Sequence, residues 1–238
     1  MLMSMVSQFK KIRIQKVLAD RGLCSRRQAE TWIEKGFVFL NGEPVTKQGV
    51  LVDPSKDSID IANHLKNKTF LYLKYYKPRG VLTHSRIGGA KCIPDLLPSK
   101  FKSLKAIGRL DKDSEGLILL TDDRVFIKSC LAPQKYFSKT YEVTLSKPLL
   151  DKHIDRLRYG MVLNQERLRP VIVKKITGSR FLFVLTQGKN RQIRKLMSRF
   201  NIQVESLKRI AYGDISLEPL NSGEWSFFEP KHVFSNRD

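Results

Sequence analysis

Two short stretches near the start of the chain have apolar side chains at helical spacing. The first stretch carries three of them, Ile14, Val17 and Leu18. Gly22 closes the helix that they predict. The second helix begins at Ser25, where Ser25 and Gln28 fit a capping box that satisfies backbone amides at the helix start. Gly36 suits its C-terminal cap, and its apolar face consists of Ala29, Trp32 and Ile33.

A strand and a tight turn follow this helix pair. Residues 37–40 predict the strand, and Asn41-Gly42 predicts a hairpin turn because both central residues of such a turn adopt positive φ. Ile59 and Ile61 are expected to complete the small sheet. Residues 63–69 are polar and predict a linker. The pattern therefore indicates a helix-helix-hairpin module over residues 10–62.

The remaining residues, 70–238, have mostly strand-like patterns. A continuous apolar run bounded by turn signals is typical of a buried strand, and Gly178-Ser179 separates two of the predicted strands. Strands are predicted at residues 70–73, 117–120, 140–145, 169–173 and 181–185. Few helical patterns interrupt them. We therefore predict an α+β fold, with helices packed on a mixed, largely antiparallel sheet.

The net charge of the chain indicates what kind of partner it binds. The sequence has 44 Lys and Arg residues against 23 Asp and Glu residues, a formal net charge of +21. So large an excess repels itself unless it meets a polyanion, and nucleic acid is the first candidate. A membrane surface is the weaker alternative. No apolar run in the sequence is long enough to span a bilayer.

Cysteine and histidine usage suggests no special chemistry. The three cysteines lie far apart and the four histidines are scattered, so we expect no disulfide and no metal site. The first residues do not resemble a signal peptide. We expect a cytoplasmic monomer.

Five charged side chains crowd into the eight residues before the buried strand at 117–120. The stretch reads Gly108-Arg-Leu-Asp-Lys-Asp-Ser-Glu-Gly116. It resembles the GRLD signature of the branch of RNA pseudouridine synthases that includes RsuA, RluB, RluE and RluF. The Asp of that signature is the catalytic residue of the family, which implies Asp111 here. Taken by itself, Asp111 would better fit a polar turn before a core strand, and it is the full string in its strand context that favours the catalytic role.

The same resemblance implies roles for three further side chains. Arg109 would enter the RNA stack as the target base leaves it; an ion pair with Asp113 or Glu115 is the alternative. Tyr141 would stack on the flipped uracil, although a strand tyrosine half in the core is the commoner fate of such a residue. Leu207 would line the pocket, and without the family it would be one more core leucine.

Residues 187–197 resemble the third motif of the family, which supplies a cation that keeps the catalytic Asp charged. Arg194 lies at the edge of an apolar helical stripe, so it can tuck its guanidinium under the helix. The resemblance implies that it pairs with Asp111, and an ordinary surface arginine is the alternative. Arg191 and Lys195 are predicted on the opposite face, where RNA phosphates or water could meet them. The stripe consists of Ile193, Leu196, Met197 and Phe200.

Two other segments carry the resemblance. Lys77 begins a KPxG motif, and we count it among the substrate-binding residues. The first module resembles the RNA-binding module named after ribosomal protein S-four, with Arg26 and Arg27 as candidate phosphate contacts. Positive charge at a helix start opposes the helix dipole, which favours an anionic partner over a simply solvated helix start.

The resemblance implies isomerisation of a uridine to pseudouridine in RNA, without a cofactor. Ribosomal RNA is the expected substrate and transfer RNA the alternative. Asp111 could attack C1′ of the ribose or take a proton from C2′, and the sequence leaves both routes open. A non-catalytic RNA-binding or ribosome-assembly factor is the competing function. A hydrolase that uses Asp111 and Glu115 as paired carboxylates is a weaker third.

Overall fold

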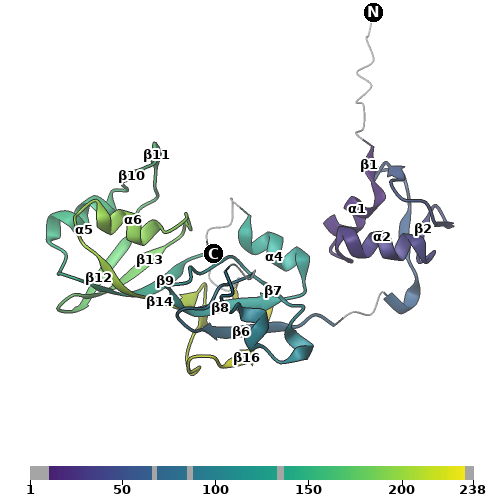
Figure 1. Ribbon diagram of the computed structural model, residues 1–238. Helices are drawn as coiled ribbons and strands as arrows, with labels where there is room; N and C mark the ends of the chain where they lie inside the picture. The colour runs from purple at the N-terminus through teal and green to yellow at the C-terminus, as the bar shows by residue number, and fades with distance from the viewer. Residues whose placement is uncertain (1–10, 66–68, 85–87, 133–136, 234–238) are drawn as a thin grey trace, which may run out of the picture. The chain divides into compact units, whose positions relative to one another are not determined.

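The computed structural model describes residues 11–65, 69–84, 88–132 and 137–233. They form two compact units (Figure 1): residues up to Phe70 together with 123–126, and Leu71–Asp122 together with the residues from Ile127 onward. The predicted linker at 63–69 ends one residue before Phe70. Within it, Asn63–Leu65 form a 3-10 turn, and residues 66–68 lie outside the described part of the chain.

The first unit packs two helices against a small antiparallel sheet. Its elements are β1 (Ile12–Arg13), α1 (Ile14–Asp20), α2 (Arg26–Glu34), β2 (Val38–Leu40), β3 (Glu43–Val45), β4 (Leu51–Val52) and β5 (Ile59–Ile61). The sheet has the order β3-β2-β5, and β1 pairs with β4. The Ser25 side of the predicted cap and the predicted turn are confirmed: Ser25 accepts a hydrogen bond from the Gln28 amide at 2.9 Å, and φ is +53° at Asn41 and +90° at Gly42.

The second unit is built on one large sheet with the order β12-β13-β9-β14-β8-β6-β16. Its strands are β6 (Tyr72–Lys77), β7 (Lys105–Ala106), β8 (Glu115–Thr121), β9 (Lys139–Leu145), β12 (Ile172–Thr177), β13 (Arg180–Leu185), β14 (Val204–Tyr212), β15 (Ile215–Ser216) and β16 (Trp225–Phe227). Among these strands only β14 and β8 pair in parallel, through two residue pairs. The predicted mixed, largely antiparallel sheet is confirmed.

Helices cover this sheet and divide its core into two clusters. The helices are α3 (Ile93–Leu96), α4 (Arg124–Leu131), α5 (Asp151–Arg158) and α6 (Gln192–Ser198), with 3-10 turns at Ser99–Phe101 and Pro230–Val233. A separate hairpin consists of β10 (Val162–Leu163) and β11 (Glu166–Arg167). One core cluster joins α5 and α6 to β9, β13 and β14, and the other joins α3 to β6 and β8. Of the described helices, none is long and apolar enough to cross a membrane.

Two predicted strands begin later than expected. The strand predicted at 70–73 starts at Tyr72 and continues to Lys77, where Pro78 follows. The strand predicted from residue 169 starts at Ile172, beyond Pro170. A proline has no amide proton for the ladder. Pro78 therefore sets the end of the first strand, and Pro170 keeps the second strand from beginning at residue 169.

Candidate active site

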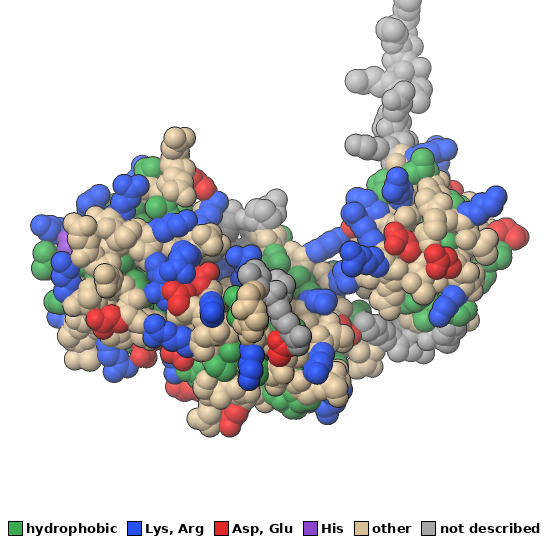
Figure 2. All heavy atoms as spheres, in the orientation of Figure 1, with side chains coloured by type: hydrophobic (Ala, Val, Ile, Leu, Met, Phe, Trp, Pro, Cys, Tyr) green, Lys and Arg blue, Asp and Glu red, His purple; other side chains and the backbone are tan. Residues whose placement is uncertain are grey.

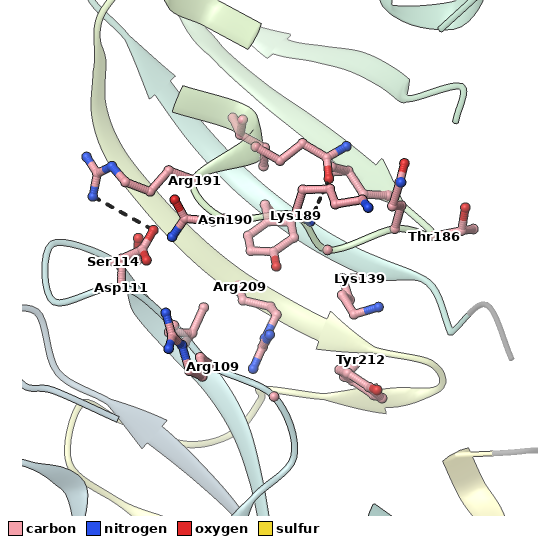
Figure 3. Close-up of a pocket in the computed structure, with 18 of the residues that line it drawn as sticks. Arg109, Asp111, Ser114, Lys139, Thr186, Lys189, Asn190, Arg191, Arg209 and Tyr212 are labelled. Atoms are coloured by element: carbon pink, nitrogen blue, oxygen red, sulfur yellow. Dashed lines mark hydrogen bonds and ion pairs between the residues drawn. The ribbon is translucent and has the colours of Figure 1, made fainter. Parts of the chain in front are cut away.

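A cavity of about 790 Å³ lies in the second unit, where β8, β9 and β14 meet the start of α6. The cavity brings together five of the residues predicted from the sequence: Arg109, Asp111, Tyr141, Arg191 and Leu207. Figure 3 shows Asp111 and Arg191 facing each other at one end of the cavity, with Lys139 and Tyr212 at the other. The cavity therefore has a charged end with a carboxylate and a second end with a lysine beside an aromatic ring.

The backbone around Asp111 is held from both sides. On one side, the buried Thr83 hydroxyl donates to the Leu110 carbonyl at 2.7 Å and accepts from the Leu110 amide at 3.1 Å. On the other side, β8 begins at a close approach to β14: a Cβ added to Gly116 would lie 2.3 Å from the carbonyl oxygen of Arg209. Gly116 has φ of +101°, which favours glycine. These contacts fix the loop that carries the carboxylate.

The predicted ion pair between Arg194 and Asp111 is wrong. The Arg194 guanidinium lies 3.2 Å from the carboxylate of Asp113 through Nε, and it donates to the Val204 carbonyl at 2.9 Å and the Asp113 carbonyl at 3.0 Å. The cation paired with Asp111 is Arg191, at 3.8 Å. Arg191 also donates two hydrogen bonds of 3.1 Å to Asp113.

The error has a local cause in the backbone of Arg191. A spacing of 100° per residue predicts Arg191 on the helix surface opposite the apolar stripe. Arg191 instead precedes α6 as its N-cap and has left-handed backbone angles, with φ of 51° and ψ of 34°. Helical spacing does not apply to a residue outside the helix, so its side chain is free to turn toward the carboxylates. Arg194 is at the stripe edge as predicted, and its side chain is only 13% exposed.

Asp113 joins both arginines into one cluster. Burial raises the pKa of Asp113, but the hydrogen bond from Arg191 and the charges of Arg194 and Arg191 outweigh burial and leave the pKa below its ordinary value. Burial also lowers the pKa of Arg194, which the Asp113 charge opposes. Asp113 is therefore held as an anion that binds both guanidinium groups and positions that of Arg191 beside Asp111.

Lys77 does not line the cavity, which corrects its assignment as a substrate-binding residue. Its side chain is fully buried, and the ammonium group donates to the carbonyls of Pro78 at 2.9 Å and Val81 at 2.7 Å. Burial lowers the pKa of Lys77 to about 8. The lysine therefore has a structural role, closing the turn that follows β6.

The other predicted RNA contacts occupy exposed or half-exposed positions. Lys195 contacts the Asn190 side chain at 3.4 Å and is not among the residues that line the cavity. Arg26 and Arg27 are exposed at the start of α2. Their contacts with RNA stay predictions.

The alternatives considered for Arg109 and Glu115 are not supported. Asp113 is occupied by Arg191 and Arg194, and Glu115 accepts a hydrogen bond of 3.0 Å from the Tyr76 hydroxyl. Arg109 is exposed at the cavity rim, whereas Glu115 does not line the cavity. Asp111 and Glu115 therefore do not face this cavity together, as the paired carboxylates of a hydrolase would.

Several cavity residues were missed by the sequence reasoning. The Lys139 ammonium group donates to the Phe137 carbonyl at 3.0 Å and lies 5.2 Å from the ring centre of Tyr212. Burial, and next the charge of Arg209, lower the pKa of Lys139 to about 8. Lys139 was recognisable in principle, because it lies two residues before Tyr141 and alternate strand residues share a face. Arg209 is buried and donates to the Leu117 carbonyl at 2.6 Å. No sequence pattern placed Arg209 near the predicted site residues.

The cavity suits an anionic ligand with a flat ring. It is lined by two acidic side chains, Asp111 and Glu166, and by six basic ones, Arg109, Lys139, Arg169, Lys189, Arg191 and Arg209. Tyr141 is half-buried and packs against both core clusters. Leu207 is 7% exposed. Among the described residues, no group of three or more His, Cys, Asp or Glu side chains could hold a metal ion.

A mainly basic cavity that holds Asp111, in a chain with a separate small module, indicates an enzyme that acts on nucleic acid. Comparison with known proteins gives the class. A family model described as RNA pseudouridylate synthase matches residues 71–199, and an S4 domain model matches residues 12–58. The chain belongs to the RNA pseudouridine synthases, isomerases that convert uridine in RNA into pseudouridine.

Individual relatives support this assignment over most of the chain. Identity is 34% over 218 residues with the dual-specificity RNA pseudouridine synthase RluF of Escherichia coli O6:H1, covering 90% of this chain and 74% of that one. It is 33% over 230 residues with the ribosomal large subunit pseudouridine synthase B of Bacillus subtilis, covering 93% of each. A crystal structure of a pseudouridylate synthase shares the fold, with a TM-score of 0.69 and 24% identity over 94% of this chain and 98% of that one.

Proposed function

We propose that this enzyme isomerises a uridine of ribosomal RNA and that Asp111 starts the reaction. The names of the relatives support the substrate, since one is described as a ribosomal large subunit synthase. The position of Asp111 carries the residue assignment. Its side chain is 26% exposed, it lines a basic cavity, and Arg191 lies 3.8 Å away.

The reaction breaks the bond between N1 of uracil and C1′ of ribose, and makes a bond between C5 and C1′. Asp111 can form a bond to C1′ while the base leaves as an anion, or it can take the C2′ proton while the base leaves. In the first route the base turns and C5 displaces the Asp111 oxygen from C1′. In the second route the base turns, C5 bonds to C1′, and Asp111 returns the proton to C2′. The C5 proton is then lost and N1 gains a proton. No electrons are exchanged with another molecule.

The neighbouring side chains would hold the base and the backbone during this turn. Tyr141 offers a ring on which a flipped uracil can stack. Leu207 supplies an apolar wall. Arg109 at the rim is exposed, so its planar guanidinium can fill the gap that the extruded base leaves in the RNA stack.

The test is the release of tritium from C5 of labelled uridine. The substrate is ribosomal RNA from cells that lack the gene, and transfer RNA from the same cells is the comparison. We expect Asp111→Asn to abolish release and to leave RNA affinity nearly unchanged, because the substitution keeps the size and removes the charge. Asp151→Asn, at an exposed position on α5, is the matched control.

The outcomes separate the candidate functions. Release by Asp111→Asn at the wild-type rate would refute the role of Asp111. Binding of RNA without any release by the wild type would favour a non-catalytic RNA-binding or ribosome-assembly factor. Release from transfer RNA alone would overturn the ribosomal substrate. That the enzyme is a cytoplasmic monomer stays a prediction, which light scattering after size exclusion and cell fractionation can test.

A further inference from the structure

We propose that the catalytic unit binds an unpaired nucleotide of its RNA in a second cavity, separated from the catalytic cavity by the β10–β11 hairpin. This inference rests on the proposed function, since it concerns the same RNA. The second cavity has a volume of about 620 Å³. It lies between the C-terminal ends of α5 and α6 and the start of the hairpin, where Arg156, Tyr159, Val162 and Arg199 line it.

Tyr159 offers a surface for stacking. Its side chain is 74% exposed, and the neighbouring Val162 is 58% exposed. The backbone of Tyr159 is fixed, because its amide donates to the Asp155 carbonyl at 3.0 Å and its carbonyl accepts from Arg167 at 3.2 Å. An aromatic ring held in water on a rigid helix end can stack on any base, since every base has a π-face.

The charges around Tyr159 fit a polyanion. The Arg156 guanidinium lies over the ring of Phe200, 5.3 Å from its centre, and Phe200 in turn stacks on His153 at 4.4 Å. Arg199 is exposed at the end of α6. The acidic residue that lines the cavity is Asp155, and it already lies 3.6 Å from Arg158. Lys and Arg side chains are scattered over the face that carries α5 and α6, with fewer Asp and Glu side chains among them (Figure 2).

The hairpin relates the two cavities to each other. Leu163 pairs with Glu166 and Val162 pairs with Arg167, and paired residues of an antiparallel ladder share a face. Glu166 lines the catalytic cavity, whereas Val162 lines the second one. Because successive strand residues point to opposite faces, the two cavities lie on opposite faces of one thin hairpin.

Helix α6 gives the spacing between the two cavities. Gln192 at its start lines the catalytic cavity, and Arg199 just beyond its end lines the second one. Seven residues at 1.5 Å each separate them by about 10 Å along the helix axis. A single strand whose target uridine occupies the catalytic cavity therefore needs only a few nucleotides to reach Tyr159. The observations thus favour unpaired RNA next to the target as the occupant.

The experiment measures RNA binding by the full chain. The probe is a fluorescein-labelled oligouridylate of about twelve nucleotides, compared with a blunt RNA duplex of the same length, at several salt concentrations. We expect Tyr159→Ala to weaken oligouridylate binding by about 5- to 150-fold, the range for removal of one base stack. Duplex binding should stay unchanged, and Tyr159→Phe should keep wild-type affinity because the ring remains.

Charge is tested separately. Arg199→Gln should lower the slope of log affinity against log salt by about 0.7, the value for one phosphate of a single strand. Lys174→Gln is the control, because Lys174 is an exposed cation on β12 that lines neither cavity. Tyr159→Ala within twofold of wild type would overturn the proposal, as would an equal loss of affinity for oligouridylate and duplex. Tyr159-dependent binding of an acidic peptide but not of RNA would identify a protein surface instead.

Tritium release separates this inference from the proposed function. If the wild type isomerises ribosomal RNA and Tyr159→Ala binds oligouridylate normally, the second site alone is wrong. If Tyr159 governs oligouridylate binding and the wild type releases no tritium from any RNA, the proposed function alone is wrong.

Discussion

Replacement of Asp113 by asparagine tests the charge cluster beside Asp111. The substitution keeps the size of the side chain and removes the anion shared by Arg191 and Arg194. Hydrogen bonds to charged groups contribute about 1.5–3 kcal/mol each to stability. The Arg191 side chain is 43% exposed, so solvent reduces its pair to about 0–1 kcal/mol. Arg194 is 13% exposed, and removal of its counter-ion is the larger cost.

We therefore expect Asp113→Asn to lower the free energy of unfolding by about 1–3 kcal/mol at neutral pH. Urea denaturation measures it, with Asp155→Asn as the control. Asp155 pairs with Arg158 at 3.6 Å, and both side chains are more than half exposed. The control should change stability by less than about 1 kcal/mol. A decrease below about 0.5 kcal/mol for Asp113→Asn would refute the reasoning.

The pH dependence provides a second check. The arginines lower the folded-state pKa of Asp113. Its stabilisation is therefore present above the unfolded-state pKa, about 3.9, and fades as the pH falls through the folded-state value. The difference between wild type and Asp113→Asn should be constant from neutral pH down to about 5 and should shrink below about 4. A difference that is as large at pH 3 as at pH 7 would contradict an electrostatic origin.

Four other features of the molecule each support a prediction. Burial lowers the pKa of Lys139 to about 8, so the lysine loses its positive charge as the pH rises through that value. The affinity of the Asp111→Asn enzyme for RNA should therefore fall over that range. Lys139→Met should remove this pH dependence in a series of binding titrations. Lys77→Met leaves the buried Val81 carbonyl and the partly buried Pro78 carbonyl without a donor and should cost about 2–5 kcal/mol in urea denaturation, with an unchanged salt slope for RNA binding. Arg26→Gln with Arg27→Gln should reduce that slope by about 0.7–0.9 for each phosphate that the arginines bind, and an unchanged slope would show that neither arginine meets phosphate. Gly116→Ala should cost about 2–5 kcal/mol, because the new Cβ meets the β14 backbone in a left-handed conformation; a stable variant would contradict this close approach.

The fold was largely predictable because its signals are local. The Asn41-Gly42 turn and the Ser25 cap each depend on residues a few positions apart. The buried strand at 117–120 likewise follows from four consecutive apolar residues, all of which are buried. The position of Asp111 at the mouth of that strand came from the same pattern.

The ion-pair and hydrogen-bond partners of Arg194 and Lys77 were less predictable, because they depend on where the fold places other segments of the backbone. Helical spacing put Arg194 at the edge of the stripe but could not distinguish Asp111 from Asp113, two residues apart in a loop some eighty residues away. Lys77 was assigned to substrate binding from its KPxG motif, and a lysine beside a proline gives no sign of burial in the sequence. Its burial depends on two carbonyls that only the folded turn brings to it.

The parallel pairing of β14 with β8 leads us to expect that activity appears only late in synthesis. Gly116 meets Arg209 after about ninety intervening residues, and closing a loop of that length costs roughly 4 kcal/mol of chain entropy before any contact repays it. Asp111 and Tyr141 are synthesised long before β14. Strand β14, which carries Leu207, is the last of the segments that line the cavity to be synthesised. A nascent chain therefore exposes Asp111 before the cavity around it is complete. Chains released at residue 200 end before β14 and should release no tritium from RNA, whereas full-length chains from the same translation reaction should.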